Sequence, residues 1–121
     1  MRDTQKNLYK KLYGKIGENK AVKYLKKQGY SVLERNYRAR FGEIDVIAED
    51  GGVLVFIEVK SRSGDGFGAP AEAVDAQKRK RYALAAAEYL QKNAAEEREC
   101  RFDVVEVKNG AINHIKDAFF A

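Results

Sequence analysis

Apolar residues along this chain follow two spacings, one typical of helices and one typical of strands. Between residues 8 and 28 the spacing is helical, and the stripe expected to face a core consists of Gly17, Ala21, Tyr24 and Leu25. Gly29 follows directly, where a glycine commonly ends a helix because it adopts positive φ angles without strain. The pattern therefore predicts one long helix near the start of the chain.

Residues 42–62 alternate with the period of two that is typical of strands, and Glu49-Asp50-Gly51-Gly52 predicts a hairpin turn between two of them. If the two glycines form the turn, Asp45 lies across from Glu58. If Asp50 and Gly51 form it, Glu43 faces Glu58 instead. Both registers place charged and apolar residues on one face of the sheet: Glu43, Asp45, Glu58 and Lys60 with Ile47, Leu54 and Phe56.

The remaining segments complete an α/β pattern. Residues 61–70 are expected to form a glycine-rich loop, and Asp75 is placed to cap a helix that ends near residue 93. Its predicted buried stripe is Ala83, Ala86, Ala87 and Leu90. Further strands are predicted over residues 30–36, 101–107 and 111–116, with a loose basic arm at residues 1–7. The order of elements predicts a single domain, residues 1–121, with a mixed sheet of about five strands flanked by helices.

The composition of the chain excludes several classes of protein. A chain of 121 residues with 45% hydrophobic residues supports one modest core. Cys100 is the single cysteine, so no internal disulfide forms and a cytoplasmic location is expected. No apolar run reaches the roughly 18 residues of a membrane span, so no membrane partner is expected. His114 is the single histidine, which excludes mechanisms built on two or more.

The net charge of +5 is unevenly distributed. Residues 1–28 carry nine basic and two acidic side chains, a second basic cluster covers residues 78–81, and residues 29–60 are net −2. Basic segments around an acidic centre favour a surface that binds a polyanion around an acid or metal site. Four tyrosines lie among these bases and either stack on nucleotides or pack in the core: Tyr9, Tyr13, Tyr24 and Tyr82.

The acidic centre offers a specific chemistry. Asp45 and Glu58, on neighbouring strands about 4.8 Å apart, can both reach one Mg²⁺ or Mn²⁺. The backbone carbonyl of Val59 is a natural third ligand, and Lys60 can hold or deprotonate a metal-polarised water. The alternative is a charge ladder on an edge strand, in which Glu43 or Glu58 pairs with Lys60 in solvent. The apolar residues around both acids argue against that alternative.

Other residues are candidates for supporting roles. Glu18, which lies beside the buried stripe of the first helix, either pairs with Lys15 or Lys23 or contacts a metal or water. Several basic residues could bind a phosphate backbone or remain as solvated surface charges. They are Lys15, Arg38, Arg40, Arg62, Lys78, Arg79 and Arg81.

The spacing of Glu18, Gly42-Glu43-Ile44-Asp45 and Phe56-Ile57-Glu58-Val59-Lys60-Ser61-Arg62 resembles the YraN-like family of bacterial proteins. That family is regarded as predicted endonucleases, similar to archaeal Holliday junction resolvases and the wider restriction-endonuclease-like superfamily. The resemblance implies a restriction-endonuclease-like fold, with Asp45 and Glu58 binding the metal, Lys60 catalytic and Glu18 auxiliary.

The resemblance also implies hydrolysis of DNA, duplex or branched, and a homodimer, because resolvases act as two-fold dimers. The alternative from another class is a nucleic-acid-binding or adaptor protein that keeps the fold without catalysis. Cleavage of RNA is a third and weaker interpretation.

Overall fold

The computed structural model describes the backbone of residues 2–62 and 76–118 and, within these ranges, the side chains from residue 8 onward. The expected loop from residue 63 and the Asp75 cap lie outside the described residues. The elements are α1 (Arg2–Lys27), β1 (Ser31–Arg38), β2 (Glu43–Asp50), β3 (Val53–Arg62), α3 (Ala76–Lys92), β4 (Cys100–Lys108) and β5 (Ala111–Ile115). This order confirms the predicted α/β layout.

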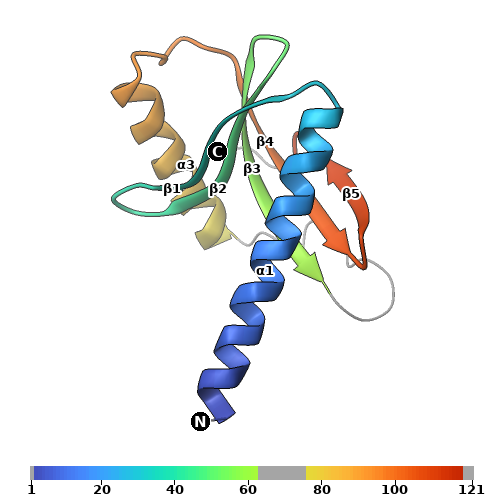
Figure 1. Cartoon of the computed structure of the whole chain (residues 1–121). Helices are drawn as coiled ribbons and strands as arrows, with labels where there is room; N and C mark the ends of the chain where they lie inside the picture. The colour runs from blue at the N-terminus through green and yellow to red at the C-terminus, as the bar shows by residue number, and fades with distance from the viewer. Residues whose placement is uncertain (1, 63–75, 119–121) are drawn as a thin grey trace.

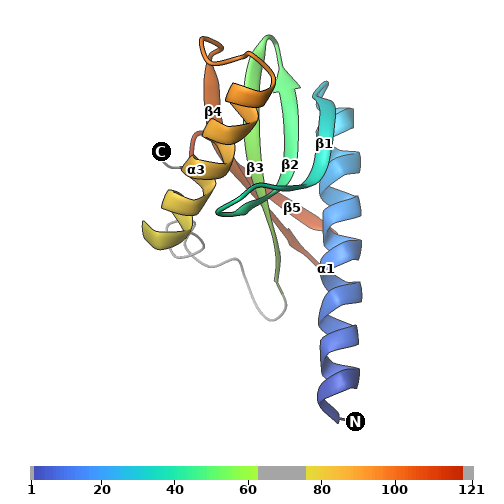
Figure 2. The same ribbon diagram turned by 90° about the vertical axis from the view of Figure 1, so that its left-hand side faces the viewer.

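The five strands form one mixed sheet in the order β1-β2-β3-β4-β5. All neighbours are antiparallel except β3 and β4, whose parallel pairing needs the long crossover that contains α3. Figure 2 shows the sheet as a middle layer, with α1 on one face and α3 on the other. Strand β3 is central, so its residues 54–58 are buried without interruption, as expected for a strand covered on both faces.

Helix α1 begins at Arg2, so the prediction of a loose arm over residues 1–7 is wrong for the part that the structure describes. No proline or glycine interrupts residues 2–7, and the helix continues through them. Its N-terminal half projects beyond the sheet (Figure 1). At the other end Gly29 has a φ of 93°, and the Gly29 and Tyr30 N–H groups donate to the carbonyls of Lys26 and Leu25, which confirms the glycine cap.

Helix α3 buries a different stripe from the predicted one. The buried residues are Tyr82, Ala85, Ala86 and Tyr89, whereas Ala87 is exposed and Ala83 and Leu90 are only half-buried. The helix is turned so that two tyrosine rings face the core, because a ring buries more apolar area than an alanine. Tyr89 packs edge-on against Phe56 and Tyr37, with ring centroids 6.0 and 5.4 Å apart. No helix in the described ranges is long and apolar enough to cross a membrane.

The β2–β3 turn selects one of the two predicted registers. Gly51 and Gly52 both have positive φ angles, 56° and 89°, and Asp50 pairs with Val53. The two glycines are therefore the turn residues, and the register extends toward Asp45 opposite Glu58. The first of the two predicted registers is confirmed.

Candidate functional site

Strands β2 and β3 separate at the point where the two acids would meet. Their ladder ends at the pair Val46–Ile57, while Ile44 of β2 continues to pair with β1. The N–H of Val59 is therefore left without a strand partner, and it donates instead to Asp45 Oδ2 at 2.8 Å. The N–H and carbonyl of one strand residue point to the same side, so the Val59 carbonyl also faces this opening.

Asp45 lies in this opening, where its surroundings disfavour the charged form of its carboxyl group. Burial raises the pKa of its carboxyl group to about 6, the charges of Glu58 and Glu18 add to the rise, and the hydrogen bond from Val59 opposes it. The carboxylates of Glu58 and Glu18 thus lie close enough to Asp45 to disfavour its charged form. A cation bound among them would remove this repulsion.

Glu58 is more deeply buried, with a side chain only 2% exposed. Its Oε1 atom forms ion pairs with Lys78 and, at 3.7 Å, with Lys60. Its Oε2 atom is also buried, and among the described residues no hydrogen-bond donor reaches it. A buried carboxylate oxygen without a partner is energetically unfavourable. A cation bound at this oxygen would supply the partner that the described residues do not. Because Glu58 is buried on a central strand, the charge-ladder interpretation does not describe this site.

The two lysines beside Glu58 differ. Burial lowers the pKa of Lys60, and the charge of Lys78 adds to this effect, although Glu58 opposes it. Burial also disfavours the charged form of Lys78, but the hydrogen bond with Glu58, the charge of Glu58 and the smaller contributions of Lys60 and Asp45 together outweigh burial, so the net shift of its pKa is upward. Lys60 therefore gives up its proton more readily than an ordinary lysine, as a proton acceptor requires.

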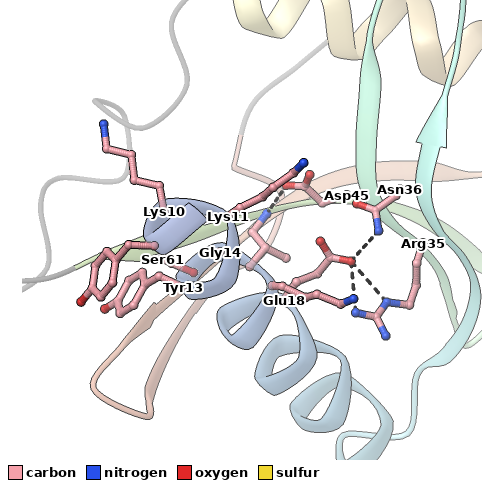
Figure 3. A pocket seen from close by; sticks show the side chains of 12 residues that line it. Lys10, Lys11, Tyr13, Gly14, Glu18, Arg35, Asn36, Asp45 and Ser61 are labelled. Carbon is pink, nitrogen blue, oxygen red and sulfur yellow. Dashed lines mark hydrogen bonds and ion pairs between the residues drawn. The ribbon is translucent and has the colours of Figure 1, made fainter. Parts of the chain in front are cut away.

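Glu18 comes from α1 and is held by β1. Arg35 Nη2 and Asn36 Nδ2 donate to its Oε1 atom at 3.1 and 3.0 Å (Figure 3). Its partner is therefore Arg35, not Lys15 or Lys23 as one interpretation of the sequence expected. The side chain is 14% exposed and close enough to raise the pKa of Asp45.

Two glycines bring the helices close to the site. A Cβ atom on Gly17 of α1 would collide with the Ser61 hydroxyl of β3 and force it to move, so the absence of a side chain at Gly17 allows this close approach. A Cβ atom on Gly42 would lie 2.9 Å from the carbonyl oxygen of Arg81 on α3. The separated end of β2 is therefore enclosed by α1 on one side and α3 on the other.

Sequence reasoning missed several supporting residues. The Tyr82 hydroxyl hydrogen-bonds with the backbone of Asp45 and so fixes the end of β2, and burial raises the pKa of that hydroxyl. The roles of Arg35 and Asn36 in holding Glu18 were also not foreseen. One signal for them was available, because an asparagine inside a strand is uncommon, and Asn36 adopts a φ of 53°.

Two pockets open on either side of Asp45, which lines both. The larger, about 860 Å³, lies between α1 and the sheet. The smaller, about 560 Å³, lies on the α3 side. Figure 3 shows the larger one, with Glu18 and Asp45 at its inner end and Tyr13 at its outer end. Asp45 is therefore reachable from both sides, whereas, of the two pockets, Glu18 lines only the larger and Glu58 only the smaller.

The predicted phosphate-binding residues separate into groups. Lys15 lines the larger pocket, and Lys78 and Arg81 line the smaller one. Three others are exposed but line neither pocket: Arg38, Arg40 and Arg79. Arg62 is paired with the buried Glu106, so its contact in this structure is structural.

The donor set fits one divalent cation. Within residues 8–62 and 76–118 no three His, Cys, Asp or Glu side chains are grouped closely enough to hold a metal. Asp45 and Glu58 supply two carboxylates, however, and the Val59 carbonyl faces the same opening. Oxygen ligands of this kind, completed by water, are what Mg²⁺ uses in proteins.

Comparison with known proteins places the chain among relatives of unassigned activity. The sequence pattern of the uncharacterised protein family UPF0102 matches residues 17–107. A UPF0102 protein of Persephonella marina is 48% identical over 106 residues, which cover 88% of this chain and 91% of the relative. One of Symbiobacterium thermophilum is 53% identical over 97 residues, covering 80% and 82%. Because the match includes most of the chain, this protein belongs to the UPF0102 family, the YraN-like family that its sequence resembles.

Proposed function

We propose that this protein is a metal-dependent DNA endonuclease that hydrolyses phosphodiester bonds at Asp45, Glu58 and Lys60. The observation that carries the proposal is the buried Glu58, whose Oε2 atom lacks a donor among the described residues while Asp45 lies across the opening between β2 and β3. A carboxylate oxygen that lacks a hydrogen-bond donor in this way is energetically unfavourable, and basic residues surround the two acids. Such an arrangement suits a site that binds a cation and a phosphate together.

Asp45, Glu58 and the Val59 carbonyl would hold Mg²⁺ or Mn²⁺. When bound, such an ion neutralises phosphate charge and activates water. Lys60 lies beside Glu58 Oε1 and, with its lowered pKa, holds the attacking water or takes its proton. Glu18, oriented by Arg35, lines the larger pocket together with Asp45 and acts as an auxiliary acid or orients water.

Substrate positioning falls to the basic residues around the two pockets. Lys15 borders the larger pocket, and Lys78 and Arg81 border the smaller one, so phosphates on both sides of Asp45 meet positive charge. Arg38, Arg40 and Arg79 extend the exposed basic surface. The substrate of the proposal is DNA, and selectivity for branched or otherwise structured DNA is its narrower form.

A second candidate function is binding of nucleic acid without catalysis. It is favoured by the ion pair between Lys78 and Glu58, which already neutralises part of the acidic charge. In that case the acids and lysines form a structural cluster below a basic surface. The two functions differ in whether loss of Asp45 changes turnover or leaves the protein's behaviour unchanged.

The test is cleavage of labelled single-stranded, duplex, flap and four-way-junction DNA with Mg²⁺ or Mn²⁺. Asp45→Asn and Lys60→Ala should each reduce cleavage by about 100-fold or more, because each removes a group that acts in the reaction. Lys92→Ala is the matched control, since Lys92 is an exposed lysine of α3 paired with Glu88. DNA binding without cleavage by the wild type would reject the nuclease proposal in favour of the second candidate.

A further inference from the structure

The projecting half of α1 has two dissimilar faces. One is an exposed apolar stripe of Leu8, Leu12 and Ile16, at intervals of one helical turn. The other turns toward the larger pocket and carries Lys10, Lys11 and Gly14, with Tyr9 and Tyr13 along its rim. The second face is continuous with the acids of the candidate site, because the same pocket contains Asp45 and Glu18.

The two tyrosines at the rim form a pre-oriented aromatic surface. Their rings are nearly parallel, at an angle of 15°, with centroids 6.1 Å apart. The Tyr13 hydroxyl donates to the carbonyl oxygen of Arg62 at 2.7 Å, which fixes its ring to the end of β3. Tyr9 is 69% exposed, so its ring is available to a ligand. A fixed ring beside an exposed one is suited to receive a flat, aromatic group.

Charge along the same pocket favours an anion that also carries such groups. Lys10, Lys11 and Lys15 are exposed and line the same pocket as the tyrosines and Asp45. In Figure 3, Lys11 points across the pocket toward Asp45, while Tyr13 lies at the far end. A volume of about 860 Å³ suits a ligand of one or two nucleotides. Aromatic rings and lysines arranged along one groove are the usual means of binding a single strand.

We propose that this pocket binds an unpaired stretch of a DNA strand, with a base stacked on the Tyr9–Tyr13 pair and the backbone on Lys10, Lys11 and Lys15. In a duplex each base is covered on both faces by its neighbours, so an internal base cannot stack on tyrosine. The preferred substrate is therefore single-stranded DNA or the single-stranded arm of a branched molecule. This inference rests on the proposed function, since it places the strand relative to Asp45.

The test measures binding without turnover. Fluorescence anisotropy in EDTA compares a labelled single strand of about 15 nucleotides with a duplex of the same sequence and with RNA of the same sequence. Tyr9→Ala should weaken single-strand binding about tenfold or more, because it removes one stacking surface. Tyr9→Phe keeps the ring and should change the affinity by less than about twofold. Leu12→Ala, which truncates another exposed apolar side chain of α1 that does not line the pocket, is the matched control.

Several results would overturn the inference. They are equal affinity for single strand and duplex, an unchanged affinity in Tyr9→Ala, or RNA bound about tenfold more tightly than DNA. If Tyr9→Ala changes the number of chains per particle in solution and leaves the DNA affinity unchanged, the tyrosines contact a second copy of the chain instead of DNA. Because binding is measured in EDTA, any of these results leaves the cleavage test of Asp45→Asn unaffected, so the two proposals fail separately.

Discussion

Two aspartates of the same sheet, the buried Asp103 on β4 and the half-buried Asp45 on β2, have pKa values shifted in opposite directions. Asp103 accepts hydrogen bonds from Arg101 Nε at 3.0 Å, from His114 Nε2 at 2.7 Å and from the Asp117 N–H at 3.0 Å. Asp45 accepts one that the structure describes, from Val59. Burial alone would raise both pKa values, but hydrogen bonds from His114 and Arg101 hold that of Asp103 below its usual range, whereas that of Asp45 rises to about 6.

The difference supports a structural role for Asp103 and the functional role proposed for Asp45. Asp103 ties β4 to β5 and to the chain after it, and two of these three partners, Arg101 and His114, have further hydrogen bonds of their own. Asp45 instead lies where β2 leaves β3, beside an unsatisfied oxygen of Glu58. Proteins retain such unfavourable charge mainly where chemistry or binding requires it.

The largest effect is expected from removing the carboxyl group of Asp103. Asp103→Ala leaves Arg101 and His114 without their shared buried partner and should lower the free energy of unfolding by about 3–5 kcal/mol. Asp45→Asn should leave it unchanged or raise it at pH 7.5, because it removes a disfavoured charge and keeps an acceptor for Val59. Urea denaturation followed by circular dichroism measures both. An equal loss in the two variants would contradict the distinction between the acids.

The next prediction uses the opposite pKa shifts. Asp45 has a folded pKa of about 6 against an ordinary 3.8, so the folded state holds its proton more tightly. Its contribution to stability is therefore present at low pH and is lost as pH rises from about 4 to 6, by about 3 kcal/mol. The pKa of Asp103 is lowered in the folded state, so the sign is opposite. The contribution of Asp103 to stability is present at neutral pH and is lost as pH falls.

Chemical denaturation of the wild type and Asp45→Asn from pH 4 to 8 checks this sign. The variant should gain stability relative to the wild type as pH rises to 6 and keep that gain above it. A difference that does not vary with pH would show that Asp45 carries no perturbed charge.

A smaller effect is expected from the glycine that brings α1 to the site. Gly17→Ala would place a methyl group against Ser61, whose Cβ atom would be 3.1 Å away, and should lower stability by about 1–2 kcal/mol. Gly14→Ala meets no atom within 4 Å and should raise stability by about 0.5–1 kcal/mol through helix propensity. Thermal unfolding of the two variants distinguishes an effect of close packing from one of helix propensity. Equal shifts of the unfolding temperature in both variants would argue against a close contact between Gly17 and Ser61.

The smallest effect concerns the outer end of the Asp103 network. The Tyr24 hydroxyl and His114 Nδ1 are 2.9 Å apart. Because a carboxylate only accepts, His114 donates to Asp103 through Nε2, and a neutral ring then accepts from Tyr24. Tyr24→Phe should lower stability by about 0.5–1.5 kcal/mol, and denaturant unfolding measures it. No change would mean that water replaces the hydroxyl.

Much of the fold follows from the sequence because its signals are local. Alternation over residues 42–62, two glycines between the strands and the glycine after α1 each act within a few residues, and the structure agrees with all three. The buried stripe of α3 could not be predicted as well. Which face of an alanine-rich helix packs inward depends on the rings of Phe56 and Tyr37, which lie far away in the sequence.

The candidate site was predictable in its acids but not in its supports. Period-two alternation places Asp45 and Glu58 on one face of the sheet in either predicted register, and the Gly51-Gly52 turn decides which acid of β2 lies nearest Glu58. The separation of β2 from β3, the hold of Arg35 and Asn36 on Glu18 and the pairing of Lys78 with Glu58 all depend on tertiary packing. The pairing of Arg62 with Glu106 is of the same kind, which is why a surface role was expected for it.

The central claim is that Asp45 and Glu58 form a cation site, and titration of Mn²⁺ by calorimetry at pH 7.5 tests it most directly. The account predicts one Mn²⁺ per chain, lost in Asp45→Asn and retained in Glu49→Gln, which removes an acid at the other end of β2 that pairs with Arg98. Absence of binding to the wild type, or binding that Asp45→Asn leaves unchanged, would contradict it.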